Sequence, residues 1–506
     1  MTGARRLGLA LLACGALAAA GAAPAADAGP ETPTDPEGPR RIAKASPRDH
    51  LPLPMPPALT PRGGDPALMP LALPAPEHLP ERIFWVPFTE TIAFNIGLWA
   101  VDRYAFNDDF ARVSWTSIGN NLAGGWTWDT DDFNTNLVLH PYQGSVYATA
   151  ARSAGYGFWG ASAFAFGGSL LWKWAGENTK PSYNDMITTT AGGTILGEAL
   201  FRISRLVLGR ASHPGLLRRL GSAVVAPAAA FNDAVLEGRI QDPDPPTPPF
   251  RAWYAIGASA GHAATHEGSV SIPFQAKLGL DLVYGLPSEV VPEKPFDHFE
   301  ASLDFSTATG TPWNSLDAVH GPSWLLSIRG LVAGSHAGIG DASRMLYGLF
   351  GTFDYGGPVV LRLSETGLGP GVVLALHPSE HATLEATFLA AGAFGSAGGK
   401  APLVGDRDYR FAFGPFLVGD VRLLLGDRVE LRATGRAFLV PAATTGSSGS
   451  ETLAIASGSV LVRLAGPHAI MLDLSGSARD ARYPPAPYHE RSFSVAASYA
   501  YLIAGP

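Results

Sequence analysis

Hydrophobic and polar residues alternate with a period of two along the C-terminal half of the chain. The segments 278–284, 299–306, 429–434, 470–475 and 492–501 each place apolar side chains on one side of an extended chain and polar side chains on the other. Segments of about ten such residues, separated by turns rich in Gly, Pro and Asp, are typical of transmembrane β-barrels. The pattern therefore predicts an antiparallel transmembrane-type β-barrel of about 10–12 strands over residues 251–506.

The N-terminal half shows the longer period of helices. Residues 88–104 carry apolar side chains at helical spacing, and we expect further helical segments over 141–174, 182–209 and 213–239. Pro141 suits the first turn of a helix, and Ser182 is followed by Asp185 at capping-box spacing. The expected fold class is α+β, in which an N-terminal helical module, residues 83–240, precedes the barrel.

Segments without periodicity delimit these two parts. Residues 27–82 are rich in Pro and in small side chains, and we expect a disordered tether there. A second Pro-rich run, residues 241–250, is the predicted linker between the helical module and the barrel. Residues 1–26 contain Arg5 and Arg6, then an apolar stretch too short to span a bilayer, then small residues, which is typical of a signal peptide.

Two processing routes are open for this signal peptide. The sequence Leu11-Leu12-Ala13-Cys14 resembles a lipobox, which would leave a lipidated Cys14. The apolar run continues past Cys14, however, and the segments 20–22 and 23–25 suit ordinary signal peptidase. Both routes take the chain out of the cytoplasm.

Composition supports an envelope protein. Hydrophobic residues make up 46% of the chain and charged residues only 16%, against roughly 25% charged residues in soluble domains. A net charge of −8 does not supply the basic face that nucleic-acid binding requires. A single cysteine excludes an internal disulfide framework and a thiolate metal cluster. We expect outer-membrane lipid as a partner and no nucleic acid, cofactor or metal; protein partners are left open.

A soluble periplasmic β-sandwich or a lipocalin-like barrel would also show alternating strands. The signal peptide, the aromatic residues near strand ends and the small side chains on the polar face favour the membrane barrel instead. Tight turns such as 426–427 contrast with longer loops at 285–296, 310–322 and 440–452. Such an asymmetry between short turns and long loops is typical of outer-membrane barrels.

Polar residues with apolar or small neighbours recur between His140 and Arg202. The uncharged run 153–172 is long enough to span a bilayer, but its glycines favour a buried helix in close contact with other helices. Because an unpaired buried charge is costly, we expect these polar residues to form one buried network. Its expected members are His140, Arg152, Glu177, Asp185, Glu198 and Arg202. In an antiparallel helical hairpin, His140 would lie near Glu198 and Arg202.

Acid–base catalysis is the alternative role for these residues. His140 and Glu198, with Asp185, are the candidate catalytic residues, and they could act on lipid or on an envelope polymer. No Gly-x-Ser-x-Gly, usable Cys or His-Glu-x-x-His motif accompanies them. The acidic residues Asp129, Asp131 and Asp132 lack the glycine and the twelfth-position Glu of an EF-hand, so we expect a solvated turn there. A structural network is therefore the favoured interpretation.

Several spaced motifs occur in order within residues 88–210. They are His-Pro-Tyr-x-Gly from His140, Ala-Ala-Arg ending at Arg152, Gly-Ser-Leu-Leu-Trp ending at Trp172, Pro-Ser-x-Asn-Asp ending at Asp185, and Gly-Gly-x-x-x-Gly-Glu ending at Glu198. In these motifs the chain resembles a bacterial family known only as domain of unknown function 3943. Lys173-Trp174 departs from the pattern, which has an acidic residue soon after the tryptophan. The resemblance implies a recurring helical module on envelope proteins and no particular chemistry.

These patterns together predict an outer-membrane protein. We expect the helical module to face the periplasm, at the mouth of the barrel or inside its lumen. The expected role is structural, passage or binding. The alternative is a membrane-associated enzyme that acts through His140 and Glu198.

Overall fold

The computed structural model describes most of the chain after residue 81. The described residues are 82–128, 131, 133–209, 214–236, 248–265, 268–308, 322–340, 343–357, 360–398, 409–441, 449–482 and 487–504. The predicted signal peptide with Cys14, the predicted tether up to residue 81 and most of the predicted linker lie outside these residues.

The N-terminal part is helical, as the period of its apolar residues predicts. The α-helices are α2 (Trp85–Ala100), α3 (Trp115–Ala123), α4 (His140–Ser153), α5 (Phe158–Ala175), α6 (Tyr183–Ile187), α7 (Gly193–Leu208), α8 (Leu216–Val225) and α9 (Pro227–Leu236). The π-helical segments η1 (Val101–Phe106), η2 (Thr135–Leu139) and η3 (Thr188–Gly192) extend α2, precede α4 and join α6 to α7. Among the described residues, no single helix combines the length and the hydropathy needed to cross a bilayer.

Small residues let α4 approach η3 and α7 backbone to backbone. A Cβ atom on Gly193 would lie 2.5 Å from Cα of Gly144, and a Cβ atom on Gly197 would lie 2.8 Å from Cβ of Ala148. The contact therefore advances along both helices in the same direction, so α4 and α7 are parallel. The predicted antiparallel hairpin is wrong, because α5 lies between α4 and α7 in the sequence and carries the chain back to the starting end.

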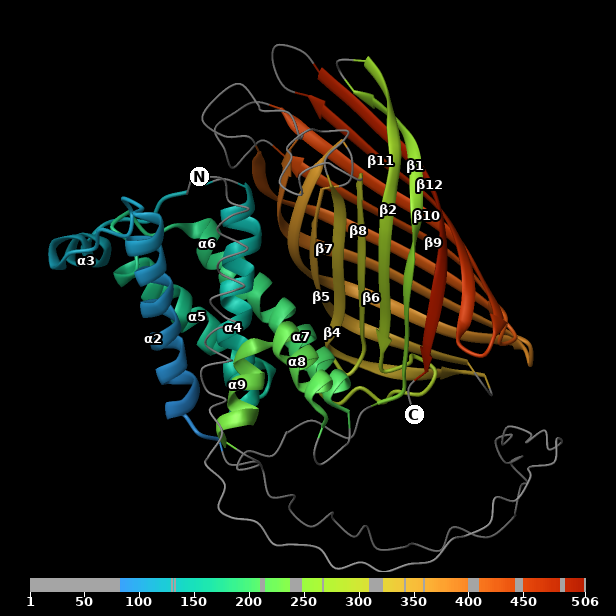
Figure 1. The fold of residues 1–506 in the computed structure, drawn as a ribbon, viewed down its shortest axis with the longest axis horizontal. Coiled ribbons are helices and arrows are strands. Elements are labelled where there is room, and N and C mark those ends of the chain that lie inside the picture. Colours follow the sequence, from blue (N-terminus) through green and yellow to red (C-terminus); the bar gives the residue numbers. More distant parts are fainter. Residues whose placement is uncertain are drawn as a thin grey trace, which may run out of the picture. The chain divides into compact units, whose positions relative to one another are not determined.

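The C-terminal part consists of antiparallel strands. They are β1 (Phe250–Thr265), β2 (Gly268–Tyr284), β3 (Phe299–Ala308), β4 (Ser323–Ile339), β5 (Ser343–Gly356), β6 (Arg362–Ser379), β7 (Ala382–Gly398), β8 (Arg410–Leu425), β9 (Val429–Pro441), β10 (Ser450–Ala465), β11 (His468–Arg482) and β12 (Pro487–Ala504). Each strand pairs with the next, and β12 pairs with β1, so the sheet closes on itself (Figure 1). The predicted α+β architecture is confirmed, with twelve barrel strands among the described residues.

The two ends of the barrel differ in the length of their connections. Short turns link β4 to β5, β6 to β7, β8 to β9 and β10 to β11 at the end that also holds Phe250 and Ala504. The long connections β3–β4, β7–β8 and β9–β10 lie at the other end. There are exceptions at both ends. The long segment 285–298 lies at the short-turn end, and the short connections β1–β2, β5–β6 and β11–β12 lie at the other end.

The helical module packs against the outside of the barrel wall. Phe158 of α5 stacks on Phe296 of the 285–298 segment with ring centroids 5.6 Å apart. Ile195 of α7 lies over Gly351 of β5, and Trp128 lies 5.2 Å from the ring of Phe411 on β8. These strand residues alternate with the residues that face the lumen, so they point outward. The expectation of a module in the lumen or at its mouth is therefore wrong for the described structure.

Outward-facing glycines explain why the module lies there. A Cβ atom on Gly330 of β4 would lie 2.4 Å from the ring of Phe296, and one on Gly351 would lie 3.2 Å from Ile195. The outer wall thus carries hollows that side chains of the module and of the 285–298 segment fill. Phe158, Ile195, Phe296 and Phe353 belong to one buried apolar cluster that spans both parts.

Because α4 and α7 approach each other so closely, a larger side chain at their contact is expected to lower the stability of the protein. We expect Gly193→Leu to lower the free energy of unfolding by about 1–3 kcal/mol or more, because the new side chain overlaps the α4 backbone. Gly167→Leu in α5 is the matched control, since a Cβ atom at this position meets nothing within 4 Å. Denaturant unfolding in detergent measures both; equal midpoints for the two variants would contradict the packing described.

Candidate functional site

One buried polar cluster of the helical module surrounds Lys173. The Lys173 ammonium donates to the carboxylates of Glu177 and Asp185. His140 Nε2 lies 3.4 Å from Asp185 Oδ2, and Ser182 also donates to Asp185. The sequence motifs pointed to His140, Glu177 and Asp185 but missed Lys173 as their common partner. Its spacing of four residues from Glu177 was the available signal.

A second buried cluster surrounds Glu198. Its carboxylate accepts from Arg202 Nε at 2.8 Å and lies 2.7 Å from Arg152 Nε. Arg202 also reaches the barrel, because its guanidinium lies 3.4 Å from Asp297 Oδ1 and donates to the Pro295 carbonyl at 2.8 Å. This cluster therefore ties α4 and α7 to the 285–298 segment.

The predicted single network is two clusters. His140 contacts Asp185 at the start of α4, whereas Glu198 contacts Arg152 near the end of α4. The expected proximity of His140 to Glu198 and Arg202 is wrong, since parallel helices place residue 140 beside residue 185 and residue 152 beside residue 198. His140 and Glu198 thus do not form an acid–base pair in this arrangement. Asp131 is described, whereas Asp129 and Asp132 lie outside the described residues.

The barrel lumen holds a layer of ion pairs near the short-turn end. Arg422 of β8 donates two hydrogen bonds of 3.1 Å to Asp281 of β2. Arg432 of β9 also binds Asp281, and it binds Asp420 at 2.7 Å. Arg329 of β4 lies 3.0 Å from the same Asp420 carboxylate. The layer consists of Arg251, Asp281, Glu300, Arg329, Glu385, Asp420, Arg422, Glu430 and Arg432.

Several of these pairs cross the lumen. In the closed strand order, β2 and β8 lie half a turn apart, and so do β1 and β7. The Arg422–Asp281 pair joins β8 to β2, and Arg251 of β1 donates to Glu385 of β7 at 3.2 Å. Side chains that bridge opposite walls fill the space between them. The ion-pair layer therefore obstructs the lumen at this level.

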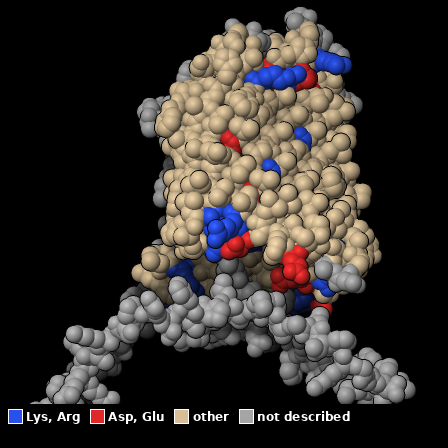
Figure 2. All heavy atoms as spheres, turned by 90° about the vertical axis from the view of Figure 1, so that its right-hand side faces the viewer, with Lys and Arg blue, Asp and Glu red and all other residues tan. Residues whose placement is uncertain are grey.

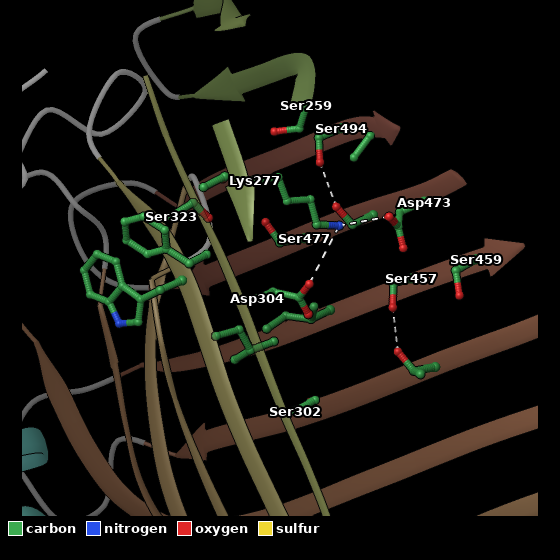
Figure 3. Close-up of a pocket in the computed structure, with 18 of the residues that line it drawn as sticks. Ser259, Lys277, Ser302, Asp304, Ser323, Ser457, Ser459, Asp473, Ser477 and Ser494 are labelled. Atoms are coloured by element: carbon green, nitrogen blue, oxygen red, sulfur yellow. Dashed lines mark hydrogen bonds and ion pairs between the residues drawn. The ribbon is translucent and has the colours of Figure 1, made fainter. Parts of the chain in front are cut away.

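A cavity of about 150 Å³ lies in the lumen on the long-loop side of this layer. Asp281 and Arg432 belong to its lining, so the ion-pair layer forms its floor. Figure 3 shows Lys277 between two carboxylates of the lining, at 3.1 Å from Asp473 and 3.7 Å from Asp304.

Serine side chains provide most of the polar lining of this cavity. They are Ser259, Ser302, Ser306, Ser323, Ser457, Ser459, Ser475, Ser477, Ser492 and Ser494. Hydroxyls of β11 and β12 pair with each other, at 2.7 Å for Ser475 with Ser494 (Figure 3). A hydroxyl both donates and accepts, and the charged groups of the lining already have partners. The cavity therefore suits a small uncharged polar molecule better than an ion. Among the described residues no group of three His, Cys, Asp or Glu could hold a metal ion.

A structural role for the Lys173 cluster predicts a large loss of stability without Lys173. We expect Lys173→Met to lower the free energy of unfolding by about 3–5 kcal/mol, because two buried carboxylates lose their partner. Lys180→Met is the control, since Lys180 is exposed and only a few residues away. Denaturant unfolding of both variants measures the difference. A Lys173→Met variant as stable as the control would show that the cluster does not hold the helices together.

Comparison with known proteins gives a family match for part of the helical module and no activity. No curated protein matches this chain. The toluene transporter TodX of Pseudomonas putida is 8% identical, with a TM-score of 0.22, over 51% of this chain and 90% of that one. The outer membrane channel DcaP of Acinetobacter baumannii is 10% identical, with a TM-score of 0.22, over 50% and 96%. An outer membrane channel of Pseudomonas putida F1 is 8% identical, with a TM-score of 0.27, over 51% and 97%.

At these TM-scores the structural likenesses carry no argument about this chain. The sequence match is more specific, because it falls on the helices that hold both buried polar clusters. It spans η2, α4, α5, α6, η3, α7 and α8. Residues 125–228 match the model of the family described as domain of unknown function (DUF3943), which confirms the resemblance drawn from the motifs.

Proposed function

We propose that this chain is an outer-membrane β-barrel protein. The outward face of the barrel supports the proposal, because large apolar side chains are exposed there on nearly every strand. They include Ile256, Leu280, Tyr347, Leu368, Phe388, Leu417, Leu431, Val460, Leu472 and Phe493. Figure 2 shows one side of the molecule, on which Lys, Arg, Asp and Glu are sparse between the two ends. A soluble barrel would expose polar side chains on this face.

The strands are long enough for the same role. A tilted strand of about 9–11 residues crosses a bilayer, and β1 and β2 have 16 and 17 residues. In outer-membrane barrels the short turns face the periplasm. We therefore place the short-turn end, with the ion-pair layer, on the periplasmic side, and the long connections on the cell exterior.

Within the lumen we propose binding of a small uncharged polar solute that enters from the long-loop side. The observation that carries this proposal is the ion pairing between opposite walls, Arg422 with Asp281 and Arg251 with Glu385, beneath the serine-lined cavity. Free diffusion through the barrel would require an unobstructed lumen. The layer thus favours a binding role over passage.

The alternative of an enzyme acting through His140 and Glu198 finds less support. The two side chains belong to separate clusters, and each is buried with charged partners. A general base must reach a proton on a substrate. Both groups instead use their polar atoms to hold helices together.

Removal of an ion pair that crosses the lumen is expected to open the barrel. In planar lipid bilayers we expect little steady conductance from the wild-type protein and a several-fold larger conductance from the Arg422→Ala/Asp281→Ala double variant. The control is Arg491→Ala/Asp480→Ala, which removes an exposed pair of 2.9 Å near the end of β11. A wild-type conductance equal to that of the Arg422 and Asp281 variant would refute the obstruction.

Filling the cavity is expected to abolish solute binding. Saturation-transfer NMR with glycerol, erythritol and xylitol on the reconstituted protein should show contact for at least one polyol in the wild type and none for Ser475→Leu. Thr116→Leu in α3 is the control, because Thr116 is outside the barrel and exposed. Polyol contact that persists unchanged in Ser475→Leu would place the binding elsewhere, and absence of contact in the wild type would contradict a polyol-like ligand.

A further inference from the structure

We propose that the helical module is embedded in the same membrane as the barrel, with the outer faces of α2 and α5 against lipid acyl chains. This inference rests on the proposed outer-membrane location of the barrel. It concerns a different surface, the side of the module that points away from the barrel wall.

The helix α2 is apolar on the outside and largely polar on the inside. In α2 the buried residues include Thr91 and Asn95, whereas Trp85, Phe88 and Ile96 are exposed. Asn95 donates to the Gly168 carbonyl of α5 at 3.1 Å, so its amide is used between the helices. In water the apolar side chains of a helix face the protein core. The reversed pattern of α2 is that of a helix surrounded by lipid.

The helix α5 is apolar on both faces, apart from Ser169 and Lys173 on the buried one, as in helices that are surrounded by apolar groups on all sides. Its one charged residue, Lys173, is 1% exposed and paired, while Trp159 is 64% exposed and Phe166 50% exposed. Ala163 and Gly167 are also exposed, so the outer face of α5 carries no charge. A face of this kind continues the apolar outer surface of the barrel.

Charges in the middle of the module are buried and paired. Arg152, Glu198 and Arg202 form one group, and Lys173, Glu177 and Asp185 form the other, with every member at most 6% exposed. Within a bilayer, ionisable side chains face the interior of a bundle and pair with one another. Exposed charges lie instead at the two ends, with Asp109 and Arg112 after η1, and Arg218 and Arg219 on α8.

No helix among the described residues has both the length and the hydropathy to cross a bilayer by itself, but the length of α5 matches the height of the barrel's apolar band. The 18 residues of α5 form a helix of about 27 Å, and the apolar band of outer-membrane barrels is about 25 Å tall. Trp159 and Trp174 lie near the two ends of α5, and Trp85 and Tyr104 near the two ends of the α2–η1 helix. Trp and Tyr concentrate at both membrane–water interfaces.

The helix α8 fits the membrane surface at the short-turn end. It follows α7, whose Arg202 contacts the 285–298 segment at that end. Leu217, Leu220 and Val224 fall on one exposed face, and the exposed Arg218 and Arg219 flank it. An amphipathic helix of this composition lies in the plane of a membrane interface.

Spin-label accessibility tests the inference on the full chain in phospholipid vesicles. Single cysteines replace Ala163 on the outer face of α5, Ile256 on the outer face of β1 and Asp109 at the end of the module, each in a Cys14→Ala background. Ala93→Cys on α2 serves as a second module site if Ala163→Cys does not fold, because Ala93 is also exposed. Nitroxide relaxation by oxygen reports lipid, and relaxation by a water-soluble nickel chelate reports solvent.

We expect the ratio of oxygen to nickel relaxation at residue 163 to equal that at residue 256 and to exceed that at residue 109 several-fold. A lipid-like ratio at residue 256 with a solvent-like ratio at residue 163 overturns the embedded module and leaves the membrane barrel standing. Solvent-like ratios at both residues overturn the membrane barrel and the embedded module together.

Discussion

The hydrogen bonds that Asp281 accepts from Arg422 and Arg432 join walls of the barrel that no backbone ladder connects. The closed sheet fixes each strand only to its two neighbours. The ion pairs add contacts across the lumen, from β2 to β8 and β9. Because each of these charges is buried, loss of one partner leaves the other charge uncompensated. Such a loss lowers the free energy of unfolding by about 3–5 kcal/mol. The layer thereby both braces the barrel and obstructs it.

In the helical module, too, buried charges need partners, and their ion pairs hold the helices together. Asp185 joins the start of α4 to α5, because it contacts both His140 and Lys173. Glu198 of α7 joins the end of α4 through Arg152. Between the two clusters, Gly144 and Gly193 bring the backbones of α4 and η3–α7 together. Small residues and buried ion pairs therefore alternate along one helix contact. Because the charges in the middle of the module are paired inside, the outer face of α5 carries none.

Much of the fold could be predicted because the spacing of apolar side chains along the sequence differs between helices and strands. Alternation at period two indicates a strand regardless of which strand it pairs with, so the barrel could be predicted. Ion pairs such as Arg422 with Asp281 could not, because they depend on which strands face each other across the lumen. Helical spacing placed Glu198 and Arg202 on one face. Helical spacing does not show whether a neighbouring helix runs parallel or antiparallel. For this reason we predicted that His140 contacts Glu198, whereas it contacts Asp185. The outward-facing Gly330 and Gly351 were the available sign that another part of the chain covers this wall.

We propose that the barrel and the outer faces of α2 and α5 form one apolar surface within the membrane. A cryo-electron microscopy map of the full chain in a lipid nanodisc tests it most directly. We expect the disc to contact both the wall formed by β9–β12 and the helices α2 and α5. A disc that surrounds the barrel alone, with the module projecting into solvent or detached from β4–β8, would contradict it.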